Sequence, residues 1–175
     1  DMYRAVDPDV QRLSDGSYRL YTLAFAAEQM CGDADDPYSY PSPHEAVTFT
    51  STDLLRWTYE GVAWTSERGT DPGTWCSGET CWLHMGGSAV SSDGGASFAP
   101  TTLVLPEQDP QLVDVRATQR GFEMLYKALE QQDLWRAEST DGQTFTAVGA
   151  LDIEGDSPTA VTWKGQAWVY TKERY

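Results

Sequence analysis

A short pattern that recurs three times is the feature that most constrains how this chain can fold. In each copy Ser, any residue and Asp are followed by a polar turn and an aromatic residue: Ser51–Trp57, Ser91–Phe98 and Ser139–Phe145. The copies start 40 and 48 residues apart, about the length of one four-stranded propeller blade. The chain is therefore predicted to be an all-β propeller built from repeated antiparallel blades.

Two further signatures set the order of the strands within a unit. A turn glycine leads into a strand of alternating aromatic and aliphatic residues at Asp15–Tyr21, Arg120–Tyr126 and Lys164–Tyr170. A few residues earlier, an Asp opens a short aliphatic strand at Asp7–Val10, Asp109–Val113 and Asp156–Val161. Each unit therefore has an Asp-led inner strand, an aromatic strand, a third strand that ends in Ser-x-Asp, and a fourth strand after the polar turn.

The repeat predicts about four blades within a single domain, residues 1–175. The blades are expected over residues 7–65, 66–105, 106–151 and 156–175, and the last of these lacks its outer strands. An unpaired blade edge invites association, so a propeller needs a neighbour for every blade. Three arrangements meet this need: residues 1–6 supply a strand, a second chain covers the edge, or the chain is part of a longer five-bladed propeller.

The charge balance selects against several classes of partner. Twelve Lys and Arg against twenty-seven Asp and Glu give a net charge of −15, and no basic cluster offers a site for phosphates. Nucleic acid and anionic membrane surfaces are therefore not expected partners. The chain also has no apolar run of eighteen residues, so a membrane span is not expected.

The three cysteines suggest a disulfide rather than a metal site. Cys76 and Cys81 bracket a Gly-containing segment that a hairpin-like loop can close, whereas no second Cys or His pair completes a zinc site. Cys31 is left over. The chain begins with Asp1 rather than Met, which suggests that a leader has been removed. From the expected disulfide we predict a secreted or periplasmic location.

The blade pattern resembles a known group of enzymes. The run Asp7–Tyr21, followed by Ser51–Asp53 and Trp57, resembles blades of the five-bladed propeller glycosidases, the arabinanase, xylosidase and invertase-like group. The segment Ser91–Phe98 also resembles the Asp-box of sialidases, a structural turn whose Asp accepts hydrogen bonds from backbone donors. The resemblance implies structural roles for Asp53, Asp93 and Asp141. No sialidase arginine triad is recognisable, which disfavours a sialidase.

The same resemblance implies an inverting glycoside hydrolase that works through carboxylates around the propeller axis. Such chemistry needs a base to activate water, an acid to protonate the leaving oxygen and a third carboxylate to tune them. Asp7 matches the base and Asp109 the pKa-modulating Asp. The segment Glu154–Pro158 loosely matches the motif of the acid, and either Glu154 or Asp156 is the candidate. The alternative is that Asp-Pro at the head of each inner strand is only turn chemistry.

Aromatic residues near the inner strands are the candidates for sugar binding. Trp75, Trp82, Tyr38 and Tyr40 can stack on sugar rings, and packing in the core is their alternative role. Tyr38 and Tyr40 lie in the longest insertion, residues 26–43, with Asp33, Asp35 and Asp36. These acidic residues suggest Ca²⁺, but their spacing lacks the Gly and Glu of an EF-hand. We therefore expect no cofactor. If the chain does bind one, Ca²⁺ is the candidate.

Two functions follow from the sequence. The first is a glycoside hydrolase-like propeller that acts on or binds a carbohydrate through Asp7, Asp109 and Glu154 or Asp156. The second is a non-catalytic propeller used for binding or assembly, in which the open blade edge pairs with another chain, including a second copy.

Overall fold

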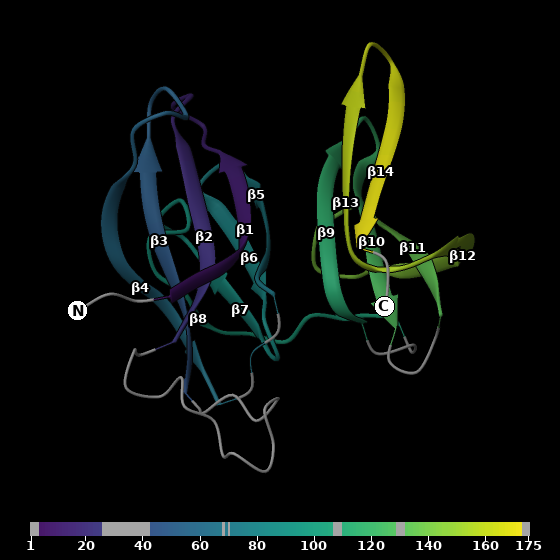
Figure 1. Cartoon of the computed structure of the whole chain (residues 1–175), viewed down its shortest axis with the longest axis horizontal. Helices are drawn as coiled ribbons and strands as arrows, with labels where there is room; N and C mark the ends of the chain where they lie inside the picture. The colour runs from purple at the N-terminus through teal and green to yellow at the C-terminus, as the bar shows by residue number, and fades with distance from the viewer. Residues whose placement is uncertain are drawn as a thin grey trace. The chain divides into compact units, whose positions relative to one another are not determined.

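The computed structural model of the chain describes residues 4–25, 43–67, 69, 71–106, 110–128 and 132–172 (Figure 1). Over these ranges the regular structure is entirely β, and no helix is present that is long and apolar enough to cross a membrane. The all-β class predicted from the repeat is confirmed. The predicted single domain divides into two compact units, Asp1–Thr101 and Thr102–Tyr175, which are described separately below.

The first unit holds two four-stranded antiparallel sheets, here called blades 1 and 2. Blade 1 has the order β1-β2-β3-β4 and blade 2 the order β5-β6-β7-β8, so each strand pairs with its neighbour in the sequence. The strands of blade 1 are β1 (Arg4–Arg12), β2 (Tyr18–Phe25), β3 (His44–Ser51) and β4 (Thr58–Ser66). Those of blade 2 are β5 (Gly73–Ser77), β6 (Thr80–His84), β7 (Ser88–Ser91) and β8 (Ala99–Pro100).

The second unit holds one complete blade and two strands of another, here called blades 3 and 4. Blade 3 consists of β9 (Pro110–Thr118), β10 (Gly121–Ala128), β11 (Asp133–Ser139) and β12 (Thr146–Glu154). Blade 4 consists of β13 (Asp156–Trp163) and β14 (Gln166–Lys172). The strand order that the three sequence signatures predict is the observed order.

Apolar side chains from both blades form the core of the first unit. Its buried members are contributed by β2, β3, β6 and β7 and by the turn after β6: Leu23, Ala46, Leu83, Met85 and Ala89. Beside them the buried Tyr21 donates a hydrogen bond of 2.9 Å to the carbonyl oxygen of Gly95. A Cβ at Gly95, which has a φ of 81°, would lie 1.8 Å from the Tyr21 hydroxyl, so this contact requires glycine.

The Ser-x-Asp pattern forms the turn between the third and fourth strands of blades 1, 2 and 3. Asp53 accepts hydrogen bonds of 2.8 Å from the backbone N–H groups of Leu55 and Arg56. Asp141 does the same for Gln143 and Thr144. The pKa values of both carboxyls are lowered because these bonds favour the ionised form.

The second copy of the turn, in blade 2, balances two opposing effects on the pKa of Asp93. Burial acts to raise the pKa of Asp93, but hydrogen bonds from Ser91, Ser97 and Ala96 outweigh it and lower the pKa to about 2. In all three turns the carboxylate is an acceptor for local donors, as expected for a residue that holds a turn together.

Candidate carboxylate site

Asp7 lies in a β-bulge of the inner strand of blade 1. Val6 pairs with Leu23 and Asp9 pairs with Tyr21, so Asp7 and Pro8 together lie opposite the single residue Thr22. Asp7 has a φ of 54°, an uncommon conformation for a residue with a Cβ. Bulges often redirect a side chain and are frequent beside active sites. Here the bulge leaves Asp7 exposed at the surface of the first unit.

Blade 4 contains the same bulge. Asp156 pairs with Lys172 and Thr159 with Tyr170, so Ser157 and Pro158 lie opposite Thr171. Ser157 has a φ of 48° and precedes a proline, as Asp7 does. The register therefore makes Ser157 equivalent to Asp7, and the equivalence of Asp156 with Asp7 suggested by the sequence is wrong by one residue. Asp156 instead corresponds to Val6.

Two residues after Asp7, the carboxylate of Asp9 joins blade 1 to blade 2. Its Oδ2 accepts a hydrogen bond of 2.7 Å from the backbone N–H of Thr74 in β5 and a second from the Thr74 hydroxyl. The side-chain amide of Gln11 donates to Asp9 Oδ1 at 3.2 Å and to the Thr74 carbonyl at 2.9 Å. Asp9 and Gln11 thereby satisfy both backbone polar groups of the buried Thr74.

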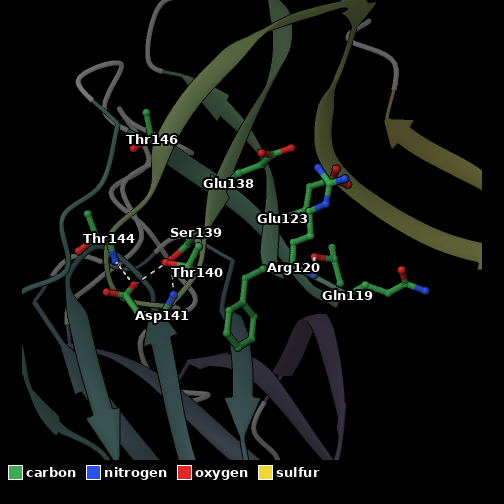
Figure 2. A pocket seen from close by; sticks show the side chains of 11 residues that line it. Gln119, Arg120, Glu123, Glu138, Ser139, Thr140, Asp141, Thr144 and Thr146 are labelled. Atoms are coloured by element: carbon green, nitrogen blue, oxygen red, sulfur yellow. Dashed lines mark hydrogen bonds between the residues drawn. The ribbon is translucent and has the colours of Figure 1, made fainter.

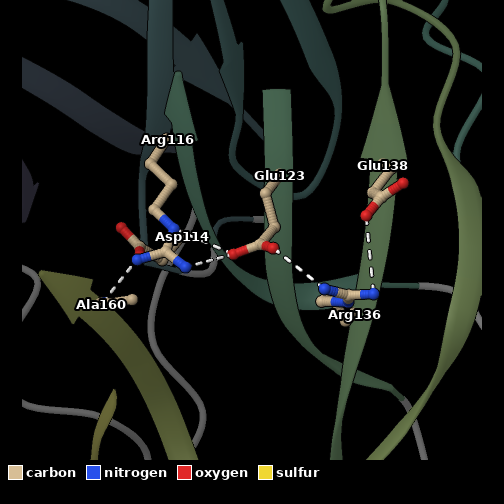
Figure 3. Close-up of polar contacts among 6 residues, drawn as sticks. All are labelled: Asp114, Arg116, Glu123, Arg136, Glu138 and Ala160. Carbon is tan, nitrogen blue, oxygen red and sulfur yellow. Dashed lines mark hydrogen bonds and ion pairs between the residues drawn. The ribbon is translucent and has the colours of Figure 1, made fainter. Parts of the chain in front are cut away.

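Asp114 makes the same type of contact between blades 3 and 4. Tyr18 pairs with Ser51 and Phe122 with Ser139. Counted from these pairs, Asp9 opposite Tyr21 and Asp114 opposite Leu125 occupy equivalent positions. Asp114 Oδ2 accepts a hydrogen bond of 2.8 Å from the backbone N–H of Ala160 in β13 (Figure 3). Each carboxylate thus binds the inner strand of the following blade, and we call the two contacts the Asp9 clasp and the Asp114 clasp.

The residues around the Asp114 clasp are charged. Arg116 Nε donates to Glu123 at 2.9 Å, and Arg136 bonds the other oxygen of Glu123 at 3.3 Å and Glu138 at 3.5 Å (Figure 3). Burial raises the pKa of Asp114, while the Ala160 N–H and the Arg116 charge act in the opposite direction. Sequence reasoning missed both Asp9 and Asp114. The signal that could have identified them is an Asp within the inner strand of both blade 1 and blade 3.

The predicted catalytic carboxylates are distributed over both units. Asp7 belongs to the first unit, Glu154 and Asp156 belong to the second, and Asp109 lies outside the described residues. Glu154 is exposed at the end of β12, and Asp156 is half-buried at the start of β13. Gly155 between them has a φ of 148°, and a Cβ there would lie 2.3 Å from Thr171 Oγ1. The assignment of Asp7 as base and of Glu154 or Asp156 as acid stays a prediction.

The predicted sugar-binding residues have different outcomes. Trp75 and Trp82 are buried, with stacked rings 6.2 Å apart across β5 and β6, which corresponds to their alternative role in the core. A buried ring has no free face for a sugar. Tyr38 and Tyr40 lie outside the described residues, as do Cys31, Asp33, Asp35 and Asp36.

Cys76 and Cys81 form a disulfide between paired positions of the β5–β6 hairpin. Within the described ranges no three His, Cys, Asp or Glu side chains form a metal-binding group.

A polar hollow on blade 3 was not predicted from the sequence. It has a volume of about 790 Å³ (Figure 2), within the size range of small-molecule sites. The β9–β10 turn and the Ser139–Asp141 turn form most of its lining. Asp141 accepts the two local backbone hydrogen bonds described above, and Glu123 is bonded to Arg116 and Arg136. The third carboxylate of the lining, Glu138, forms an ion pair with Arg136 at 3.5 Å. All three carboxylates therefore already have partners within the protein, which disfavours them as catalytic groups.

Comparison with known proteins relates the fold to glycoside hydrolases. No family model matches the sequence, and no curated protein matches it. Among solved structures, the chain resembles sucrose-6-phosphate hydrolase from Lactobacillus gasseri with a TM-score of 0.68 at 15% identity, over 94% of this chain and 39% of that one. It resembles a family 43 β-1,3-galactosidase with a TM-score of 0.69 at 13% identity, over 94% and 67%.

A third similar structure is a family 117 glycoside hydrolase from the marine bacterium Zobellia galactanivorans, with a TM-score of 0.64 at 14% identity. The match covers 89% of this chain and 48% of that one. The chain thus spans less than half the length of two of these three enzymes. At such identities the likeness concerns the fold alone. The chain has the all-β propeller fold of these glycoside hydrolases, as the resemblance of its repeats predicted.

Proposed function

We propose that this chain acts on or binds a carbohydrate through the carboxylate of Asp7, with Asp7 as the base of an inverting glycoside hydrolase. The observation that carries the proposal is the bulge of β1, which holds Asp7 exposed in a left-handed conformation ahead of Pro8. Uncommon backbone conformations of this kind are concentrated at functional sites. The fold shared with three glycoside hydrolases supports the same class of chemistry.

The contrast between Asp7 and Asp9 supports the choice of residue. The carboxylate of Asp9 already accepts hydrogen bonds from Thr74 and Gln11, so it is occupied in holding two blades together. Asp7 is exposed and is available to a water molecule and a sugar. Of the two carboxylates on this strand, Asp7 therefore suits the base and Asp9 suits a structural role.

The proposed reaction is a single displacement. Asp7 takes a proton from a water molecule while the oxygen of that water attacks the anomeric carbon. At the same time an acid gives a proton to the leaving oxygen as the glycosidic bond breaks. We propose Glu154 or Asp156 as that acid and Asp109 as the carboxylate that tunes it. The fold and the matching of these residues to the motifs of propeller glycosidases support the assignment.

A panel of aryl-glycosides tests the proposal. The wild-type protein should release the phenol from at least one of them, and Asp7→Asn should lower kcat/KM by about 100-fold or more, because the amide cannot accept the proton. The matched control is Asp152→Asn, since Asp152 is exposed on β12 with the same φ of 54°. This control should keep its activity within a small factor.

Two results would count against the proposal. Hydrolysis that survives in the Asp7→Asn variant would remove Asp7 from the mechanism. A wild-type protein that neither hydrolyses the panel nor binds oligosaccharides in calorimetry would argue against any carbohydrate function of this chain.

We also propose a secreted or periplasmic location, which the Cys76–Cys81 disulfide supports.

A further inference from the structure

The two faces of each blade differ in what they contact. We call the face that carries the clasp position the leading face: Asp9 in blade 1, Asp114 in blade 3 and Thr159 in blade 4 are equivalent in register. The opposite face is the trailing face. Within each unit the leading face of one blade lies against the inner strand of the next, since Asp9 bonds Thr74 and Asp114 bonds Ala160.

The leading face of blade 4 is aromatic and exposed. The register places Thr159 with Tyr170, Val161 with Trp168, and Trp163 with Gln166. The four large apolar side chains of this face are between 46% and 64% exposed: Val161, Trp163, Trp168 and Tyr170. A cluster of exposed apolar side chains of this kind marks an interaction surface.

The equivalent positions of the other blades show what normally covers this face. Tyr170 of blade 4 corresponds to Tyr21 of blade 1 and to Leu125 of blade 3, which are 0% and 2% exposed. Tyr21 donates its hydrogen bond to Gly95 and packs edge-on against Phe98, both in blade 2. The natural occupant of a leading face is therefore the trailing face of another blade.

Blade 1 presents a trailing face that is also exposed. One row of this face runs across all four strands through Val10, Leu20, Phe49 and Tyr59. Val10 is 44% and Tyr59 49% exposed, and the rings of Phe49 and Tyr59 contact each other with centroids 5.3 Å apart.

The same row in blade 2 shows how such a face is covered. Its equivalent residues are Thr74, Leu83 and Ala89, and all three are buried. Leu83 and Ala89 pack there with Leu23 and Ala46 of blade 1. The trailing row of blade 1 thus has the composition and register of a surface on which another leading face stacks.

We propose that the leading face of blade 4 binds a second copy of this chain, which presents the trailing face of its blade 1. The contact joins two different surfaces, so it is heterologous. The matching apolar character of the two faces and their shared register with the observed junctions carry this assignment. Because each chain has a net charge of −15, the association should strengthen as salt screens the repulsion.

The mass of the protein in solution tests the proposal. Sedimentation equilibrium of the wild-type chain should show reversible association, and Trp168→Lys or Tyr59→Lys should each weaken it at least about tenfold. Leu55→Lys is the control, because Leu55 is 86% exposed in the turn after β3 and outside both faces. It should associate like the wild type. Circular dichroism and the thermal transition establish that each variant is folded, and Trp163→Gln replaces Trp168→Lys if that variant fails to fold.

Mixing the two variants separates a heterologous contact from a symmetric one. Each variant alone should associate at least about tenfold more weakly than the wild type. A mixture of Trp168→Lys and Tyr59→Lys should form a dimer more readily than either alone, because one intact leading face then meets one intact trailing face. A wild type that stays monomeric at every concentration would overturn the proposal. So would a Tyr59→Lys variant that associates normally, because the leading faces would then be binding each other or another surface.

Discussion

The Asp9 clasp and the Asp114 clasp use carboxylates at the same register position, but in different surroundings. Asp9 accepts hydrogen bonds from three neutral donors, namely the Thr74 N–H, the Thr74 hydroxyl and the Gln11 amide. Asp114 accepts one from the Ala160 N–H and lies beside the Arg116–Glu123 ion pair. Gln11 and Arg116 are themselves equivalent in register, so the neutral and the charged clasp are two solutions to one structural problem.

The difference shows that a repeated position conserves a geometry rather than a chemical environment. In the Asp9 clasp the hydrogen bonds compensate the carboxylate for its loss of water. In the Asp114 clasp the loss of water has the largest effect on the pKa of the carboxyl. Burial raises this pKa, although the Ala160 N–H and the Arg116 charge act to lower it. The Asp9 clasp should therefore depend on its carboxylate more strongly than the Asp114 clasp does.

Removal of the Asp9 carboxylate should have the largest effect. Asp9→Ala leaves the N–H and the hydroxyl of the buried Thr74 without this acceptor, so we expect a loss of about 3 kcal/mol in the free energy of unfolding. Urea denaturation followed by Trp fluorescence measures the loss. The exposed Glu67→Ala is the control and should leave stability unchanged. A loss below about 1 kcal/mol would show that the clasp does not hold the two blades.

Replacement of each carboxylate by its amide should separate the two clasps. Asp9→Asn should lower the free energy of unfolding by about 2 kcal/mol, because one acceptor oxygen becomes a donor that faces other donors. Asp114→Asn keeps an acceptor for the Ala160 N–H and should cause no loss at neutral pH.

The pH dependence gives the sign of the Asp114 effect. The folded-state pKa of Asp114 is raised, so its ionised form disfavours the fold, and wild-type stability falls as pH rises through the unfolded-state pKa toward the folded one. The advantage of Asp114→Asn over wild type should therefore be present at neutral pH and vanish below the unfolded-state value. Equal losses for both amide variants at neutral pH would show that the clasps are energetically alike.

Conversion of the charged clasp toward the neutral one should reduce stability less than either change at Asp9. Arg116→Gln removes the cation next to Asp114, while Arg136 still bonds Glu123 at 3.3 Å, so we expect a loss of about 1 kcal/mol. The pKa of Asp114 should rise further, because the Arg116 charge lowers it. A carboxyl-carbon NMR titration measures this change. An unchanged or lower pKa would show that Arg116 does not act on Asp114.

Local sequence signals predicted the parts of the fold that depend on neighbouring residues. The Ser-x-Asp pattern marked three turns because the carboxylate of Asp53, Asp93 or Asp141 bonds N–H groups only two to four residues away. The turn glycines marked the hairpins between first and second strands, since Gly16, Gly121 and Gly165 have φ values of 87°, 128° and 76°, which favour glycine. Such short-range constraints are visible in a single chain segment.

These local signals did not predict the contacts between blades. Asp9 bonds a residue 65 positions away and Asp114 one 46 positions away, so nothing near either residue identifies its partner. Trp75 and Trp82 show the same limit, because a Trp in a strand suits a sugar-binding surface or a core equally well until the neighbouring sheet is placed. The candidate site was the hardest part to predict from the sequence, since its residues come from different blades.

By itself, the sequence determined that this chain consists of repeated antiparallel β units, in what order their strands follow, and where their turns lie. These features depend on side-chain alternation and on hydrogen bonds within a few residues. Only the tertiary structure decided which inner-strand carboxylate is exposed and which is engaged. One extra residue in the β1 bulge changes the register of Asp7 relative to Asp9, and the Thr74 donors that engage Asp9 come from a separate blade.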